Sequence, residues 1–269
     1  MRPVGLLLPV LLFGTTLSAQ DVDSIRRSYT LTLPPTVQVE QIPFWISPGS
    51  SSGTPTAYGA EFGDVFFGAS YQRRARYTHL DDGDAYIGFG LGNPREYLGI
   101  ELNLTSFTTV RRGFFSQSSF SFKIHRALPG NLRVAYGWED AIHSPGTDGG
   151  SSMYGVLTES IPTRDDPDAF LSRITLSAGV GNGRFQKERA FYENRRGVNG
   201  FGSVGVRVFK PIALLADWTG QDLMLGASIV PFRRLPLFIT PAYADVTGSA
   251  GDGARFVIGV GFDYSFLRN

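Results

Sequence analysis

Apolar and polar residues alternate along most of the chain from about Gly63 onward, in stretches separated by turn-forming residues. A period of two is typical of β-strands with one apolar and one polar face. The alternation is clearest in the last stretch, Arg255–Phe266, whose apolar positions are Phe256, Ile258, Val260, Phe262, Tyr264 and Phe266. The opposite face of this stretch carries small or polar residues. The pattern therefore predicts an all-β protein.

About twelve such stretches can be counted, and ten or fourteen are the realistic alternatives. The expected strands span residues 64–72, 86–91, 98–105, 119–125, 132–139, 151–160, 173–180, 203–208, 212–218, 222–229, 235–239 and 255–266. The sixth is ambiguous in its faces, because its apolar residues do not keep to alternate positions.

Alternation alone would also fit a soluble sandwich or a lipocalin-like barrel with its apolar face inward. Three observations favour lipid on the apolar side. The polar face is small as well as polar, the stretches match the length of a tilted membrane-crossing strand, and aromatic residues lie near their ends. Backbone groups in lipid must all be paired, so the sheet has to close. The prediction is a closed, antiparallel, up-and-down transmembrane β-barrel.

The lengths of the connections give an independent test, because membrane barrels have short turns at one end and longer loops at the other. The long connections are Arg73–Asp84, Ser106–Ser118, Asp140–Gly150, Gly183–Val198 and Val246–Ala254. The short ones are Gly92–Glu96, Ala127–Asn131, Lys210–Pro211 and Pro231–Arg234. The two kinds alternate nearly throughout, which favours an even strand count with both termini at the short-turn end.

The N-terminus is predicted to direct export. Arg2 precedes the apolar stretch Val4–Phe13, and Leu17–Ala19 resembles a cleavage site, so residues 1–19 are expected to be a cleaved signal peptide. The apolar stretch is too short for a membrane anchor, which needs about 20 residues. Residues 20–62 are expected to form an extension rich in proline, serine and glycine, with residues 63–269 as the barrel. A linker is preferred for the extension, and a plug inside the barrel is the alternative.

An exported chain whose last strand alternates in this way resembles bacterial outer-membrane β-barrels of the porin-like kind. The resemblance implies location in the outer membrane of a Gram-negative-type envelope, with the extension in the periplasm. It also implies recognition by the barrel-assembly machinery through Phe262, Tyr264 and Phe266. The family's signal usually ends on an aromatic residue, whereas Leu267–Asn269 follow here. The turn Asp217–Asp222 is similar to that of barrel families linked to exopolysaccharide export.

Composition narrows the chemistry. The chain has 33 glycines, no cysteine and a net charge of +1, so disulfides, cysteine nucleophiles and cysteine-based zinc sites are excluded and nothing favours nucleic acid. No motif for a metal or another cofactor is found. The neighbours His143 and Ser144 cannot both face lipid, as the residues of a barrel-embedded lipid hydrolase do, so no catalytic residue is assigned and the chain is not expected to be an enzyme.

Two groups of charged residues remain as candidates. Mixed charges are expected on the inner face, at Glu101, Lys123, His125, Arg133, Glu139, Arg173, Arg207, Asp217, Asp222 and Asp263. Arginines are expected on external loops, where guanidinium groups would meet phosphate-rich lipid headgroups, at Arg73, Arg74, Arg76, Arg111, Arg112, Arg184, Arg189, Arg195 and Arg196.

Three functions follow from these candidates. The small, mixed-charge inner face favours a narrow pore or transport accessory for small hydrophilic or anionic solutes, or for polysaccharide. The alternative is a non-conducting structural or surface-interaction barrel whose arginine-rich loops bind lipid headgroups. A lipid hydrolase is the third and weakest. The sequence does not indicate an oligomeric state.

Overall fold

The computed structural model describes residues 47–75, 79–107, 117–145, 150–187, 189–190, 193, 197–232, 234–248, 250 and 253–267. Contacts divide the chain into residues 1–41 and 42–269, and all described residues belong to the second unit. The expected signal peptide and residues 20–46 of the extension lie outside the described part.

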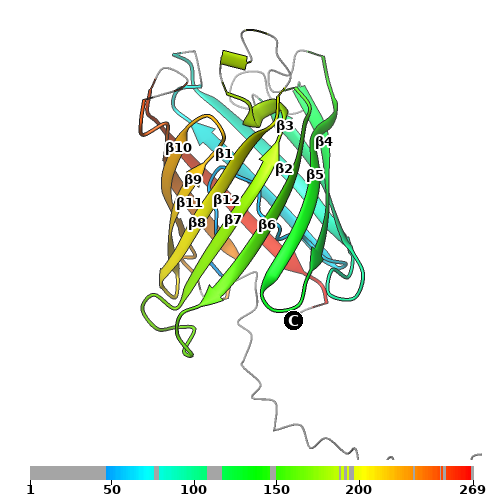
Figure 1. Ribbon diagram of the computed structural model, residues 1–269, viewed down its shortest axis with the longest axis vertical. Coiled ribbons are helices and arrows are strands. Elements are labelled where there is room, and N and C mark those ends of the chain that lie inside the picture. Colours follow the sequence, from blue (N-terminus) through cyan, green and yellow to red (C-terminus); the bar gives the residue numbers. More distant parts are fainter. Residues whose placement is uncertain are drawn as a thin grey trace, which may run out of the picture. The chain divides into compact units, whose positions relative to one another are not determined.

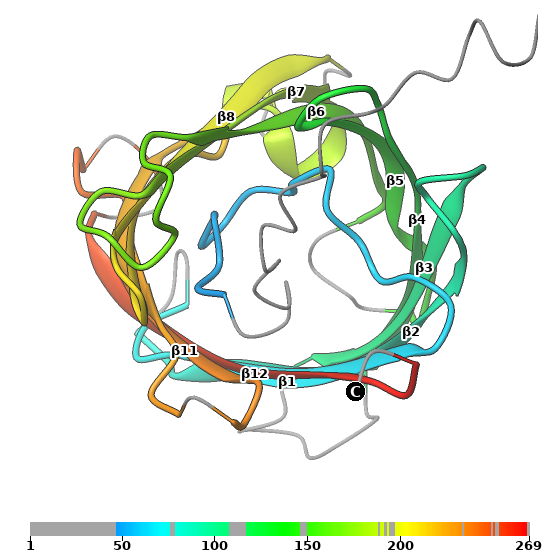
Figure 2. The same ribbon diagram turned by 90° about the horizontal axis from the view of Figure 1, so that it is seen from below.

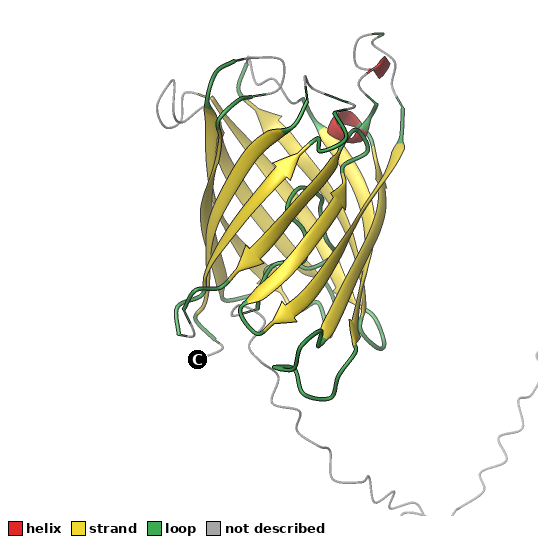
Figure 3. Ribbon diagram, turned by 90° about the vertical axis from the view of Figure 1, so that its left-hand side faces the viewer, coloured by secondary structure: helices red, strands yellow, loops and turns green. Residues whose placement is uncertain are grey.

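The described residues form twelve antiparallel strands that close into a barrel, as the alternation predicts (Figures 1 and 3). Each strand pairs with its neighbours in the chain, and β1 pairs with β12 to complete the ring. The strands are β1 (Asp64–Gln72), β2 (Asp82–Gly92), β3 (Gly99–Phe107), β4 (Gln117–Ala127), β5 (Leu132–His143), β6 (Ser152–Pro162), β7 (Arg173–Gly181), β8 (Asn199–Phe209), β9 (Ile212–Trp218), β10 (Leu223–Ile229), β11 (Leu237–Ala244) and β12 (Arg255–Ser265).

Apolar side chains cover the outside of the barrel. Phe67 of β1 stacks on Phe262 of β12 across the closing pair, with ring centroids 5.0 Å apart. Leu157, in the middle of β6, leaves 49% of its surface exposed. A ring of strands with exposed apolar residues outward and polar residues inward is the reverse of a soluble barrel.

Strand β6 explains why its faces were ambiguous in the sequence. Leu157 points outward, but Tyr154 and Val156 point inward and are buried. Apolar residues therefore stand on both faces of this strand, and the period of two disappears from the sequence.

Inward-facing aromatic rings lie directly across from glycines on the neighbouring strand. A Cβ added at Gly137 would come within 2.3 Å of the Tyr154 ring, so the ring occupies the space that a side chain would need. Five lumen-facing pairs follow this arrangement: Phe66 with Gly88, Tyr86 with Gly68, Tyr154 with Gly137, Phe201 with Gly179, and Phe238 with Gly261. The rings lie along the wall, which keeps the centre of the barrel free for other groups.

The two ends of the barrel differ as the connection lengths predict. One end, the loop side, carries the longer connections, including the short 3-10 helix η2 (Gly183–Phe185), and the other, the turn side, carries the shorter ones and the end of β12 (Figures 1 and 3). Two connections depart from this rule: Thr219–Asp222 is a tight connection on the loop side, and residues 163–172 are a long one on the turn side. Among the described residues, no helix is long and apolar enough to cross a membrane.

Candidate functional site

The lumen contains a segment of the chain itself. Residues Ser47–Phe62, here called the inserted segment, run through the interior of the barrel before β1 begins (Figure 2). Gly49 contacts Ser228 near the turn side, Ser52 contacts Asp217 near the loop side, and Ala60 returns to the turn-side end of β3. The segment thus rises and descends within the barrel, so for residues 47–62 the preferred linker interpretation is corrected in favour of the plug.

Asp217 of β9 is the main polar anchor of the inserted segment. Its carboxylate is fully buried and accepts hydrogen bonds from the Ser51 hydroxyl (2.5 Å), the Ser52 amide (3.0 Å) and the Ser52 hydroxyl (2.6 Å). The Thr54 hydroxyl donates a further bond at 3.0 Å. Four donors around one buried carboxylate supply the solvation that the charge loses on leaving water.

An apolar cluster holds the middle of the inserted segment. Ala57 is fully buried among Tyr154, Phe185 and Phe201, and its amide donates to the Thr158 hydroxyl at 2.8 Å. Phe185, which belongs to η2, stacks on Phe201 with centroids 4.4 Å apart. The loop-side helix and the inserted segment are therefore packed on the same rings.

The returning part of the segment is fixed near the turn side. The Ala60 amide donates to Glu101 at 2.9 Å, and Glu101 forms an ion pair with Lys123 at 3.0 Å. The Ala60 carbonyl oxygen lies 3.0 Å from Nε2 of the buried His125. One turn-side residue, Arg133, lies over the ring of Tyr58, 5.1 Å from its centroid.

Two inner-face glycines make room for the backbone of the inserted segment. A Cβ at Gly90 would meet the Glu61 carbonyl oxygen at 2.3 Å, and a Cβ at Gly205 would meet the Ser50 carbonyl oxygen at 2.9 Å. Both contacts are with backbone, which cannot rotate away as a side chain can. These positions require glycine because another part of the chain crosses them closely.

Arg184 closes the loop side over the segment. Its guanidinium pairs with the Glu139 carboxylate through two nitrogens, the Nη2–Oε1 distance being 2.9 Å, and its Nη1 donates to the Gly53 carbonyl oxygen at 3.1 Å. Burial lowers the pKa of Arg184, but Glu139, Tyr154 and Asp140 together more than offset it, so the pKa lies above its ordinary value and the group stays charged. The side chain of Gln221 donates to the Arg184 carbonyl oxygen at 3.1 Å.

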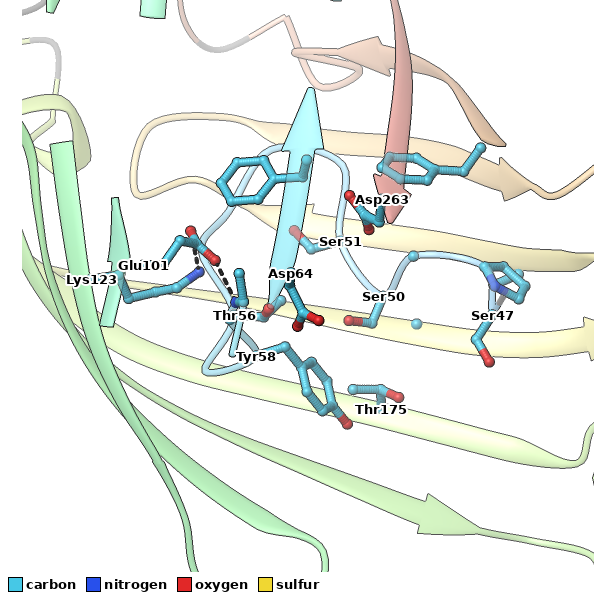
Figure 4. A pocket seen from close by; sticks show the side chains of 18 of the residues that line it. Ser47, Ser50, Ser51, Thr56, Tyr58, Asp64, Glu101, Lys123, Thr175 and Asp263 are labelled. Carbon is cyan, nitrogen blue, oxygen red and sulfur yellow. Dashed lines mark hydrogen bonds and ion pairs between the residues drawn. The ribbon is translucent and has the colours of Figure 1, made fainter. Parts of the chain in front are cut away.

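A cavity of about 430 Å³ remains between the inserted segment and the barrel wall (Figure 4). Ser47, Ser50 and Tyr58 line it from the segment. From the wall it is lined by charged residues at Asp64, Glu101, Lys123, Arg173, Arg207 and Asp263. Its lining mixes polar and apolar residues and carries both signs of charge.

The ten residues expected on the inner face divide into three groups in the structure. The first group contacts the inserted segment directly and consists of Asp217, Glu101, His125 and Arg133. Lys123 acts on the segment through its ion pair with Glu101, and Glu139 acts through its ion pair with Arg184. Arg173, Arg207 and Asp263 line the cavity. Asp222 forms an ion pair with Arg255 at 3.3 Å near the loop side.

The loop arginines are only partly described. Arg73 is exposed, Arg74 donates to the Gly253 carbonyl oxygen at 2.7 Å, and Arg189 pairs with Glu193 at 2.7 Å. Arg184 lies in a loop-side connection, as expected, and there it binds Glu139 and the Gly53 carbonyl oxygen. Arg76, Arg111, Arg112, Arg195 and Arg196 lie outside the described residues.

Three further expectations can be placed. Phe262 and Tyr264 stand on the outer face of β12, and Phe266 follows its end with its ring 5.0 Å from that of Tyr264. His143 approaches the Asp140 carbonyl oxygen and Ser144 that of Ser118, so the two form no nucleophile–base pair. Within the described part of the chain, no group of three or more metal-ligating side chains is placed to hold a metal ion.

The strand order makes the chain a closed, antiparallel, twelve-stranded β-barrel. No family model matches the chain, and no curated protein matches it. Among solved structures it is similar to the N-terminal β-barrel domain of OprF from Pseudomonas aeruginosa, with 12% sequence identity, a TM-score of 0.19, and coverage of 77% of this chain and 100% of that one. The function of the chain is therefore argued from its own residues.

Proposed function

We propose that the protein is an outer-membrane β-barrel that forms a narrow pore, or a transport accessory, for small hydrophilic or anionic solutes, and that the inserted segment is its gate. The observation that carries the proposal is the path of Ser47–Phe62 through the lumen. The segment is anchored at Asp217, Thr158 and Glu101, which belong to three different parts of the wall.

The exposed apolar surface supports a membrane environment. Large apolar side chains such as Ile87, Leu157 and Val180 stand outward and exposed, and a soluble protein rarely exposes a continuous apolar band of this kind. The closed ring leaves no strand edge unpaired, as lipid requires.

The anchors of the gate support reversible movement. Asp217, Glu101 and Arg184 are charged groups that water would solvate well if the segment left the lumen, and the cavity beside the segment already carries charged residues of both signs. Apolar packing of the segment is concentrated at Ala57. Withdrawal would therefore expose little apolar surface and would leave a polar passage.

A disulfide lock tests the proposal. A Cβ at Gly49 would lie 3.7 Å from the Ser228 Cβ, close to the separation of about 3.8 Å in disulfides, and the natural chain has no cysteine to interfere. The double variant Gly49→Cys, Ser228→Cys is expected to cross-link on oxidation. In planar bilayers the oxidised form should stay closed, and reduction should restore small conductance steps.

Each single-cysteine variant is the control, and its conductance should not respond to oxidation or reduction. Absence of conductance in the wild-type protein and in the reduced double variant, at any salt concentration, would contradict the pore. A double variant that cross-links but conducts equally in both states would contradict the gate.

A second candidate is a non-conducting barrel whose loop-side arginines bind lipid headgroups. This candidate is favoured by a loop-side cavity of about 460 Å³, whose charged or titratable lining residues are Arg73, Arg74, His79 and Arg255 together with a single carboxylate, Asp81. Under this function, the double variant Arg73→Gln, Arg74→Gln should retain less anionic lipid through purification, whereas Arg164→Gln on the turn side should retain as much as the wild type. Equal retention in both variants would contradict it.

A further inference from the structure

Two arginines face each other directly across neighbouring strands of the inner wall. Arg173 of β7 is paired in register with Arg207 of β8, and both line the 430 Å³ cavity. Opposite residues on antiparallel strands have Cβ atoms about 4.5–5.5 Å apart, and like charges at this separation destabilise the pair. The arrangement requires a compensating negative charge.

Of the two arginines, Arg207 is the one whose guanidinium is buried with a donor that has no hydrogen-bond acceptor among the described residues. Only 5% of it is exposed, its Nη2 donates to the Lys210 carbonyl oxygen at 2.9 Å, and its Nε is buried without a hydrogen bond. Neither Arg207 nor Arg173 forms an ion pair with any described residue. A guanidinium in this state has donors available in fixed directions.

The carboxylates near the arginines form no ion pair with them. Asp168, whose negative charge acts on Arg207, binds Lys210 Nζ at 2.5 Å. On the far wall of the cavity, Glu101 pairs with Lys123, Asp64 accepts a hydrogen bond from the Glu61 amide, and Asp263 forms no ion pair with a described residue. The cavity is therefore divided into an acidic side with its own lysine and a cationic side without a counter-ion from the described residues.

We propose that Arg173 and Arg207 form a binding site for a small oxyanion of the phosphate class. Arginine pairs with such groups through two parallel N–H···O bonds, and the Thr175 hydroxyl, buried on the same face of β7, adds a donor two residues from Arg173. A cavity of this volume lies within the range of ligand pockets, about 300–1,000 Å³. The site defines the class of solute that the proposed pore would carry. Its role in transport depends on that proposed function.

Equilibrium dialysis of the purified full-length protein against radiolabelled inorganic phosphate, in non-ionic detergent and at constant ionic strength, tests the site. Arg173→Gln and Arg207→Gln are each expected to weaken phosphate binding at least about tenfold. Arg164→Gln, which removes an exposed turn-side arginine outside the cavity, should bind as the wild type does. Competition by sulfate, glycerol phosphate and acetate distinguishes free phosphate, phosphate esters and carboxylates as the natural source.

Binding is measured here without a membrane, so its outcome is independent of conductance. Wild-type protein that retains no phosphate at millimolar concentration would overturn the site, as would equal weakening in the Arg164→Gln control. Folding of each variant is checked by heat-dependent migration on gels. If Arg207→Gln does not fold, Arg173→Gln and the nearly isosteric Thr175→Val decide, and unchanged affinity in both would overturn the site.

Discussion

Replacing Asp217 by asparagine is expected to release the inserted segment from the barrel wall. Four donors of the segment surround this carboxylate. The asparagine side chain is neutral, keeps one acceptor oxygen, and turns an amide donor toward donors of the segment. The substitution therefore weakens the anchor with little change in volume.

The magnitude follows from the bonds. The single proton of the Ser51 hydroxyl is shared with the Thr54 carbonyl oxygen at 2.6 Å, which leaves three donors committed to Asp217. A hydrogen bond to a charged group contributes about 1.5 kcal/mol or more, so three contribute about 4.5 kcal/mol. Because asparagine still accepts one bond, we expect a loss of about 3 kcal/mol, and the released population should rise roughly 100-fold.

Thiol reactivity at position 57 measures the released population. Ala57 is fully buried while the segment is in place, so a cysteine there reacts only after release. In the Ala57→Cys background, the rate of maleimide labelling should rise about 100-fold on adding Asp217→Asn, provided that return of the segment is fast relative to labelling. The natural chain lacks cysteine, so the label reports this site alone.

Asp263→Asn is the matched control, because Asp263 is a carboxylate of the same lumen that has no hydrogen bond to the described residues of the segment. It should change the labelling rate less than about threefold, an effect as small as that of an exposed ion pair on stability. A labelling rate in Asp217→Asn within twofold of the background, about 0.4 kcal/mol, would refute the assignment of Asp217 as the anchor.

Two further perturbations test the outer surface and the loop-side closure. Leu157→Arg places a charge in the middle of β6 and is expected to reduce the free energy of unfolding in lipid by about 2–4 kcal/mol. Ile142→Arg, near the loop-side end of β5, should reduce it by only about 0–1 kcal/mol. Denaturant titration in vesicles measures both, and equal costs would argue against a membrane-spanning band. Glu139→Gln removes the ion-pair partner of the half-exposed Arg184. The loss of about 1 kcal/mol of ion-pair stabilisation should make trypsin cleave after Arg184 roughly fivefold faster. Cleavage after Arg164 on the turn side is the internal standard and should not change.

The sequence by itself determined the barrel. A strand places alternate residues on opposite faces, so the period of two around Val65, Leu102 or Val260 assigned the strand and its apolar face. The small polar face, the strand lengths and the aromatic residues near strand ends then placed the apolar face outward. The lengths of the connections, which are also read directly from the sequence, distinguished the loop side of the barrel from the turn side. The charged residues expected inside, such as Glu101 and Asp217, followed from the same alternation.

Only the tertiary structure decided what fills the lumen. The contacts that hold the inserted segment join residues far apart in the chain, as when Gly49 meets Ser228 at a separation of 179 residues and Ser52 meets Asp217 at 165. The run of serine, glycine and proline at Ser47–Gly53 has no periodicity, so its sequence fits a linker as well as a plug. At the inner-face glycines Gly90 and Gly205, the space that a side chain would need belongs to the backbone of the inserted segment. A local pattern records which face a residue occupies, whereas the partner on that face depends on how the closed ring brings distant strands around one interior.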